Sequence, residues 1–297
     1  MQNDNLRAYV NLHLIVFIWG FTAILGALIT VHSEALVWYR LLLASVFMFF
    51  FIVYKKISLK IPIKIVYQLF CVGFLIALHW IFFFKAIKTS NVSVTLAIFS
   101  LGAFITSLLE PLLYNRKILW YEVLLGIIII TALLLVLQVE IDRLEGIIYA
   151  LISIILGVLF TLFNGKLIAH HNASVITFYE FLSGIVCISI YFLYQTEITV
   201  ESFRLTLNDF ILLLILASVC TAYAFTASVK LMERLSPFTV MLTTSLEPVY
   251  GILLAYFILG NEEKMSSNFY IGAFVIFITV LLNGILKYFN TQKKDLI

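Results

Sequence analysis

Long apolar runs, separated by short polar or charged segments, occupy almost the whole chain. Most runs are about 20 residues long, the length that an α-helix needs to cross a hydrocarbon layer of about 30 Å. We therefore predict an all-α integral membrane protein with ten transmembrane helices. The runs place these spans at 12–31, 35–54, 65–84, 91–113, 119–139, 146–168, 173–194, 210–229, 237–259 and 268–289.

Composition excludes most other classes of protein. Hydrophobic residues make up 63% of the chain, charged residues only 12%, and the mean hydropathy is +1.10. A soluble domain of this length needs far more polar surface, and no polybasic tail is present that would bind nucleic acid. The partners that we expect are the lipid bilayer and a small-molecule substrate, with the protein working as a monomer.

Basic residues are distributed unequally between the two sides of the predicted membrane. The loops and ends on one side carry 13 lysines and arginines, and those on the other side carry 5, with Arg40 inside a span. Basic loops remain in the cytoplasm. The bias predicts that both termini are cytoplasmic and that the protein lies in the cell (inner) membrane.

The chain contains a weak internal repeat. Residues 90–115 align with residues 236–261 without a gap, at an offset of 146. We expect two halves, 1–140 (spans 1–5) and 141–297 (spans 6–10). A unit of five spans crosses an odd number of times, so the second half is inverted, and transporters of this design bind substrate where the halves meet.

Several segments together resemble a known family. They are FIWGFTAILG (17–26), LVWYRLLLASV (36–46), SLEPVYGILLAYFILGNE (245–262) and YIGAFVIFITVLL (270–282). With these segments the chain resembles the drug/metabolite transporter superfamily, specifically its ten-helix members with two EamA-type halves. The resemblance implies a central cavity lined mainly by spans 1, 3, 4, 6, 8 and 9. It also implies substrates such as amino acids, other small metabolites or drugs, commonly exported.

The strongest candidate for transport chemistry is Glu247, because a carboxyl near the middle of a span is costly unless it has a role. Pro248 follows it and removes a helical hydrogen bond from the Thr244 carbonyl, and Thr244 and Ser245 add hydroxyl groups. Desolvation disfavours the charged carboxylate, so we predict proton coupling at Glu247, with a purely structural hydrogen-bonding role as the alternative. Pro248 is one predicted hinge.

The second predicted hinge is Gly102 of the fourth span. The family often has a proline at this position, so whether the two halves move alike is left open.

Other intramembrane groups are further candidates for binding or coupling. Arg40 either binds an anionic substrate group or extends toward the interface and backbone carbonyls. Glu180 lies at a different depth, about 12 Å from Arg40, so we expect no direct ion pair between them. His79 is either functional or a packing residue. Four aromatic residues are predicted to line a cavity or fill the core: Trp19, Trp80, Tyr179 and Tyr223.

Motifs for other activities are missing from the sequence. No GxxxxGK[ST] phosphate loop, HExxH or GxSxG occurs, and His170 and His171 have no further ligand at metal-binding spacing. We expect no enzyme, cofactor or metal site. The predicted function is a secondary transporter working by alternating access, with export as its direction and protons or exchange as its driving force. The alternative is a channel-like or non-transporting membrane partner protein.

Overall fold

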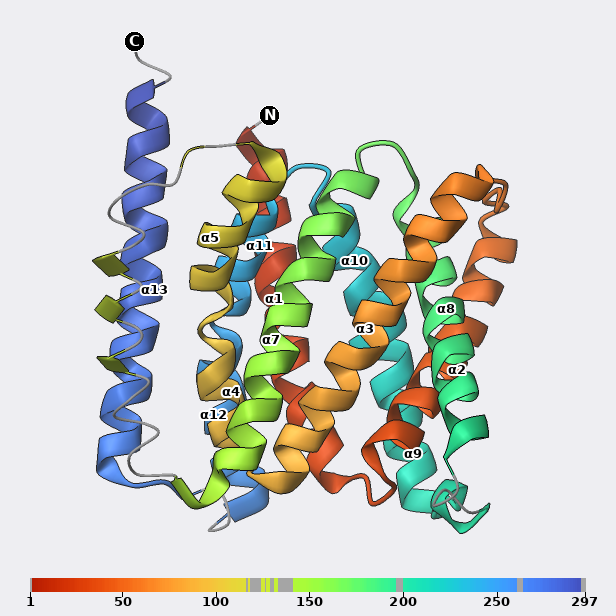
Figure 1. Ribbon diagram of the computed structural model, residues 1–297. Helices are drawn as coiled ribbons and strands as arrows, with labels where there is room; N and C mark the ends of the chain where they lie inside the picture. Colours follow the sequence, from red (N-terminus) through yellow and green to blue (C-terminus); the bar gives the residue numbers. More distant parts are fainter. Residues whose placement is uncertain are drawn as a thin grey trace.

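The computed structural model describes residues 2–115, 117, 124–125, 127–128, 131–132, 141–195, 200–260 and 264–294, and the described part is a bundle of helices (Figure 1). Eight helical segments in it are long and apolar enough to cross a membrane. They match eight of the ten predicted spans, and a ninth falls on the final helix, whose apolar described part, Ser267–Thr279, is shorter. Most of the predicted span 119–139 lies outside the described residues.

The helices follow the chain in an up-and-down order. The first half contains α1 (Gln2–Leu28), α2 (Ser33–Tyr54), α3 (Ile63–Thr89), α4 (Val92–Phe99) and α5 (Gly102–Tyr114). After a 3₁₀ turn at Ile141–Arg143 come α7 (Leu144–Leu167), α8 (Ala173–Tyr194), a 3₁₀ turn at Val200–Phe203, α9 (Leu207–Ile215), the π-helix η3 (Leu216–Tyr223), α10 (Ala224–Leu231), α11 (Pro237–Thr244), α12 (Glu247–Leu259) and α13 (Ser267–Lys294).

Both ends of the chain lie on the same side of the bundle, which we call the terminal side (Figure 1). The other is called the opposite side. The loop at residues 55–62 and the ends of α7 and α10 lie on the terminal side, whereas the loop at residues 29–32 lies on the opposite side. The described basic residues therefore divide between the two sides as the loop pattern predicts.

Two predicted spans are each broken into two helices. The span at 91–113 is interrupted at Ser100–Leu101, and the span at 237–259 is interrupted at Ser245–Leu246. At the second break the Ser245 and Leu246 amides donate to carbonyls three or four residues back, and α12 begins with Pro248 in its first turn. An N–H is not needed at that position. The break at Ser245–Leu246 lies between Thr244 and Pro248, the stretch in which a proline removes a helical hydrogen bond, and Pro248 itself stands in the first turn of α12.

The two broken segments correspond at an offset of 145, one residue from the sequence alignment. Asn91 and Ser236 cap the two segments at their N-termini, and each side chain accepts a backbone N–H. Both segments end at a residue with a positive φ angle: Asn115 (φ 53°), in the left-handed helical region, and Gly260 (φ 71°). This register places Gly102 opposite Glu247, whereas the sequence alignment placed it opposite Pro248.

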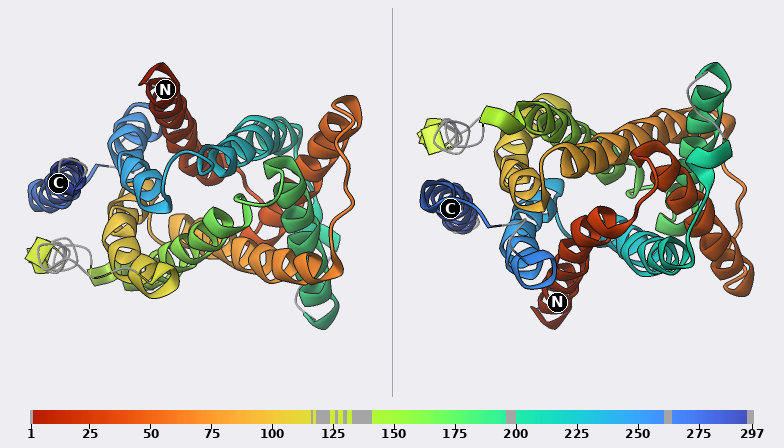
Figure 2. Two further views of the ribbon diagram at one scale, coloured as in Figure 1. Left: turned by 90° about the horizontal axis from the view of Figure 1, so that it is seen from above. Right: turned by 90° about the horizontal axis from the view of Figure 1, so that it is seen from below.

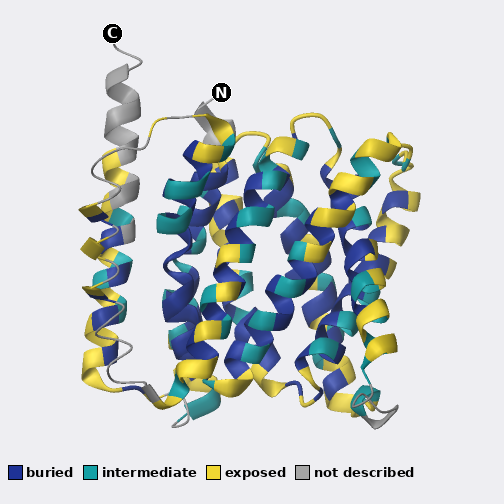
Figure 3. Cartoon of the chain, viewed as in Figure 1, coloured by how far each residue is buried: buried dark blue, intermediate teal, exposed yellow. Residues whose placement is uncertain are grey.

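Packing distinguishes a central group of helices from a peripheral one. The broken segments run in opposite directions, so that α4 packs on α12 and α5 on α11, while α13 stands at the edge of the bundle (Figures 1 and 2). Many large apolar side chains remain exposed on the outer faces (Figure 3). Phe50 is 65% exposed and Phe257 is 78% exposed, as expected for surfaces that contact lipid.

Candidate functional site

A central cavity lies between both halves of the chain. Helices α1, α2, α3, α4, α7, α10, α11 and α12 all contribute to its walls, and the empty space is about 770 Å³, counting the part open to solvent. The resemblance implied most of these helices but not α2, which contributes Arg40. The cavity combines an aromatic wall of Trp19, Trp80, Phe83, Phe99, Phe160 and Phe225 with the polar residues Thr22, Arg40, His79, Thr161, Asn164, Ser228, Thr244 and Glu247.

Arg40 is the basic residue of this cavity, and it is only 2% exposed. Its Nε donates a 2.6 Å hydrogen bond to Thr221 Oγ1, and its guanidinium carbon lies 3.8 Å from the centroid of the Trp80 ring. Its terminal NH1 group is buried and has no hydrogen-bond partner among the described residues. Burial of this kind does not fit an arginine that extends to the membrane surface. Thr221 and the Trp80 ring thus hold the guanidinium in place, while its NH1 group has no acceptor among the described residues.

The π-helix η3 supplies the partner that holds Arg40. Thr221 donates to the Leu216 carbonyl five residues earlier, the spacing of a π-turn. In the same segment the Cys220 carbonyl accepts a 3.2 Å hydrogen bond from Trp19 Nε1. Such irregular turns occur often at functional sites because they redirect side chains and free carbonyls. Here the hydrogen bonds of Thr221 and of the Cys220 carbonyl connect η3 of the second half to α2 and α1 of the first half.

Glu247 lies in the same cavity at the start of α12, and it is 6% exposed. Arg40 and Glu247 are close enough to interact electrostatically, but their charged atoms are not within ion-pair distance. Thr244 also lines the cavity and donates its hydroxyl to the Val240 carbonyl. The cavity therefore holds one basic and one acidic side chain, Arg40 and Glu247, that do not contact each other directly.

His79 contacts the cavity from α3 and is held by Ser153 of α7. Its Nδ1 lies 2.7 Å from the Ser153 carbonyl, and Ser153 Oγ donates to the His79 carbonyl at 2.8 Å. A carbonyl only accepts, so Nδ1 carries the hydrogen and a neutral ring has Nε2 as its acceptor. The histidine thus joins α3 to α7, as a packing residue would, and also lines the cavity.

Glu180 lies behind the cavity wall and not in the cavity. It is fully buried, and its Oε2 accepts a 3.4 Å hydrogen bond from Asn164 Nδ2. Asn164 itself lines the cavity. The contact of Glu180 is therefore with Asn164, and Arg40 is bound to Thr221, in keeping with the expectation that Arg40 and Glu180 form no ion pair.

The remaining sequence candidates lie outside the cavity. Tyr179 donates to the Leu59 carbonyl in the loop before α3, and Tyr223 is 52% exposed on the outer face. Ser245 is buried and donates to the Met241 carbonyl. Gly102 packs closely on Met241, where an added Cβ would lie 2.8 Å from the methionine Cε.

On the opposite side of the bundle, polar contacts hold the loop at residues 29–32 against α3 and α9. Lys88 of α3 donates to the carbonyls of Ile29 and Val31. Asp209 of α9 accepts from the Thr30 amide at 2.8 Å and from its hydroxyl at 2.9 Å. These contacts join α3 and α9 to the α1–α2 loop.

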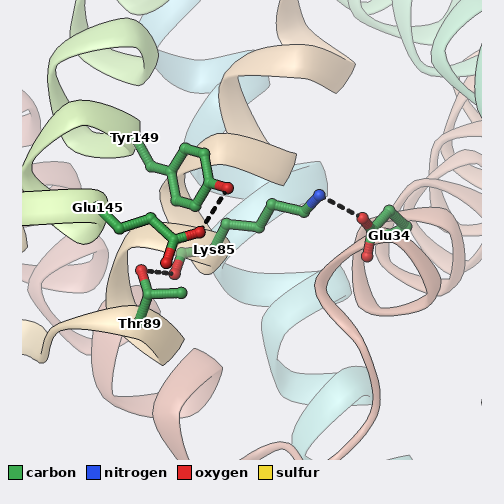
Figure 4. A network of polar contacts seen from close by, with 5 residues as sticks. All are labelled: Glu34, Lys85, Thr89, Glu145 and Tyr149. Carbon is green, nitrogen blue, oxygen red and sulfur yellow. Dashed lines mark hydrogen bonds and ion pairs between the residues drawn. The ribbon is translucent and has the colours of Figure 1, made fainter.

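An ion pair adds to these contacts (Figure 4). Lys85 lies 2.6 Å from Glu34, while Tyr149 donates to the neighbouring Glu145. Lys85 and Lys88 are two of the basic residues on the side where such residues are few. Both have polar partners at this end of the bundle.

Comparison with known proteins agrees with this geometry. A model of the EamA-like transporter family matches residues 6–138 and 144–285. The chain belongs to this family. An EamA-like chain is a multi-pass membrane transporter of small solutes, within the drug/metabolite transporter superfamily, and not a member of an enzyme family.

A solved structure, titled only as a crystal structure of a protein, shares the fold of this EamA-like chain. Its TM-score is 0.69 at 13% sequence identity, and the match covers 94% of this chain and 97% of the other. At this identity the likeness concerns the fold alone. No curated protein matches the sequence.

Three residues of this EamA-like site were not singled out from the sequence. Thr221, Asn164 and Ser153 are small polar residues in apolar spans, and each bonds a candidate residue. Their hydroxyl and amide groups are the signal that could have identified them, because polar side chains in a membrane join helices. In the described part of the chain, no group of three or more His, Cys, Asp or Glu residues could hold a metal ion.

Proposed function

We propose that the protein is a secondary transporter that moves small metabolites, amino acids or related compounds, across the cytoplasmic membrane by alternating access. The supporting observation is the central cavity, which both halves of the chain line and which contains Arg40 and Glu247. Export is the proposed direction, with protons or exchange as the driving force, and drugs are a further substrate class. The termini are proposed to face the cytoplasm.

The charges in the cavity support a zwitterionic substrate. The buried NH1 of Arg40 lacks an acceptor, and a substrate carboxylate would provide one. Glu247 is the complementary group for a substrate ammonium. The aromatic wall that includes Trp80, Phe160 and Phe225 would then contact an apolar side chain.

Closure on the opposite side favours alternating access over a channel. Leu36 of α2, and Phe84 and Ile87 of α3, lie between the cavity residues Arg40 and Trp80 and the opposite ends of these helices, and each is at most 4% exposed. The Lys88 and Asp209 contacts lie beyond them. A channel needs a continuous polar path, whereas a transporter needs a site that is open to one side at a time.

Counterflow in liposomes tests transport itself. Purified protein is reconstituted with a high internal concentration of an unlabelled L-amino acid, and uptake of the same labelled amino acid is followed over time. A transporter gives transient accumulation that saturates with substrate, while a channel or a non-transporting partner protein gives none.

Ligand analogues test the zwitterion assignment. Thermal stability of the purified protein is measured with an apolar L-amino acid, with the corresponding amine and with the corresponding carboxylic acid, because ligand binding stabilises the folded state. We expect stabilisation by the complete amino acid only. Equal stabilisation by the amine would show that Arg40 does not bind a substrate carboxylate.

A further inference from the structure

Three buried side-chain oxygen atoms on α7 and α8 have no hydrogen-bond partner among the described residues. They are Glu180 Oε1, Asn164 Oδ1 and Thr177 Oγ1, and all three residues are 0% exposed. The contact from Asn164 Nδ2 to Glu180 Oε2, at 3.4 Å, joins the two helices here. Buried polar atoms almost always have partners. The Glu180 and Asn164 oxygens therefore lack hydrogen-bond donors, and the Thr177 hydroxyl, which can itself donate, is not within hydrogen-bond distance of either.

We propose that Glu180 is a proton-binding site, separate from Glu247, which exchanges its proton with the cavity past Asn164. A proton on the carboxyl changes one oxygen from an acceptor into an O–H donor. The new O–H can donate to the Asn164 amide oxygen, because the Asn164 side chain already contacts the same carboxyl group. The proton also removes the negative charge.

The surroundings provide no other compensation for a charged Glu180. The buried charged groups on the helices that pack against α8 have other partners, and Lys64, Tyr67 and Cys71 of α3 and Lys166 of α7 are exposed. Arg40 of α2 bonds Thr221, and His79 of α3 bonds Ser153. Lys85 and Lys88 bond residues on the opposite side, and Lys230 of α10 lines a separate surface cavity. An ionised carboxylate at this depth would have no counter-charge, which is costly in a dry interior.

The same atoms fit a metal ion less well. A sodium ion needs a shell of several oxygen ligands, and the three side chains here come from helices whose carbonyls already accept helical hydrogen bonds. A proton needs one carboxyl oxygen and one acceptor. Glu180 and Asn164 provide both.

Asn164 provides the route between this site and the cavity. It lines the cavity, whereas Glu180 does not. Asn164 thus contacts both the cavity and Glu180, so a proton can pass between them at the Asn164 amide. The proposal rests on the proposed transport function, because it makes movement of the cavity walls the event that opens or closes this route.

Infrared spectroscopy tests the site without requiring transport. Wild-type protein, Glu180→Gln and Glu247→Gln are reconstituted in lipid nanodiscs, and the C=O band of protonated carboxyl groups is recorded over a range of pH. We expect Glu180→Gln to lose one band, and Glu247→Gln to retain that band. In Asn164→Leu we expect the Glu180 band to shift, because its carboxyl loses a hydrogen-bonding partner, and to exchange more slowly in D₂O.

The outcomes separate the proposals. An unchanged spectrum in Glu180→Gln overturns the proton site, as does a band that appears only when sodium is removed. If Glu180→Gln does not fold, the test is the comparison of wild-type protein with Asn164→Leu. A carboxyl band that does not shift in Asn164→Leu would also refute the proton site. Absence of counterflow in wild-type protein that shows the expected bands would reject the transport function alone.

Discussion

Arg40 Nε and Thr221 Oγ1 lie 2.6 Å apart, so that a charged group of the first half is held by a π-turn of the second. This contact leaves the guanidinium with a fixed orientation in the cavity. If substrate binds Arg40, its affinity depends on a threonine that need not touch the substrate.

Thr221→Val tests this positioning role. Hydrogen bonds to charged groups contribute about 1.5–3 kcal/mol, so we expect substrate affinity to fall by about tenfold or more. Thr221→Ser keeps the hydroxyl and should bind nearly as wild type. Binding is measured by calorimetry, and equal affinities of the valine and serine variants would contradict the role.

Arg40→Lys keeps the charge but loses the planar fork, so we expect weaker binding of carboxylate substrates with expression retained. Arg40→Ala should lose either folding or binding. Expression yield and counterflow are measured together for both variants. Neither proposed role of Arg40 survives if the alanine variant leaves both measurements unchanged.

Glu247→Gln tests proton coupling at the cavity carboxyl. Glutamine resembles the protonated carboxyl in shape and charge, and its amide oxygen can still accept a hydrogen bond from a substrate ammonium, so the variant should fold and exchange substrate with lower affinity. We expect an imposed pH gradient to accelerate transport by wild-type protein and not by the variant. Transport in proteoliposomes is compared with and without the gradient, with exchange at equal pH as the control. If the pH gradient accelerates both proteins equally, Glu247 is not the coupling group and its role is structural.

Lys88→Met tests closure of the opposite side. The substitution removes two charge-assisted hydrogen bonds to the α1–α2 loop, each worth about 1.5–3 kcal/mol. We expect a larger population open to that side, measured as faster reaction of Trp19→Cys with an impermeant thiol reagent applied from it. Native cysteines are replaced by serine in these proteins.

Lys85→Met is the matched control for Lys88→Met. Its ion pair with Glu34 is partly exposed, and such pairs contribute about 0–1 kcal/mol. We expect a smaller increase in reactivity at Trp19→Cys. Equal rates in wild-type protein and Lys88→Met would show that Lys88 does not hold this side closed.

Cysteine labelling in intact cells tests the orientation. Arg204 and Lys60 are both exposed, on the opposite and terminal sides respectively. In the cysteine-free background, Arg204→Cys should react with an impermeant maleimide, and Lys60→Cys should react only after the membrane is permeabilised. The reverse pattern would place the termini outside the cell.

Gly73→Ala tests the close approach of α3 and α8. An added Cβ would lie 2.3 Å from the Glu180 carbonyl oxygen, which belongs to the backbone and cannot rotate away. We expect a loss of stability of about 1–3 kcal/mol, measured by unfolding in detergent. At Gly184 the nearest atom to an added Cβ is Leu41 Cδ1, at 2.8 Å, and a side-chain end can move. Gly184→Ala should therefore cost less.

The chain's helices and many of its cavity residues could be predicted from the sequence. Spans follow from the length of local apolar runs, and the predicted span at 173–194 coincides with α8. Arg40, His79, Glu247, Trp19 and Trp80 line the cavity. The first three were selected as ionisable groups inside spans, and the two tryptophans as aromatic residues that line a cavity or fill the core. Charge inside a membrane is expensive wherever it lies, so this signal needs no tertiary structure.

Only the tertiary structure decided which face of each helix points inward. Lipid and a protein core are both apolar, so hydrophobicity along a membrane helix does not distinguish them. Tyr179 and Tyr223 were therefore predicted beside Trp19 and Trp80 but lie outside the cavity. The roles of Thr221 and Asn164 likewise depend on contacts between different helices. Packing between helices decides these roles, because a hydroxyl or amide can bond a charged side chain only where the fold places that side chain next to it.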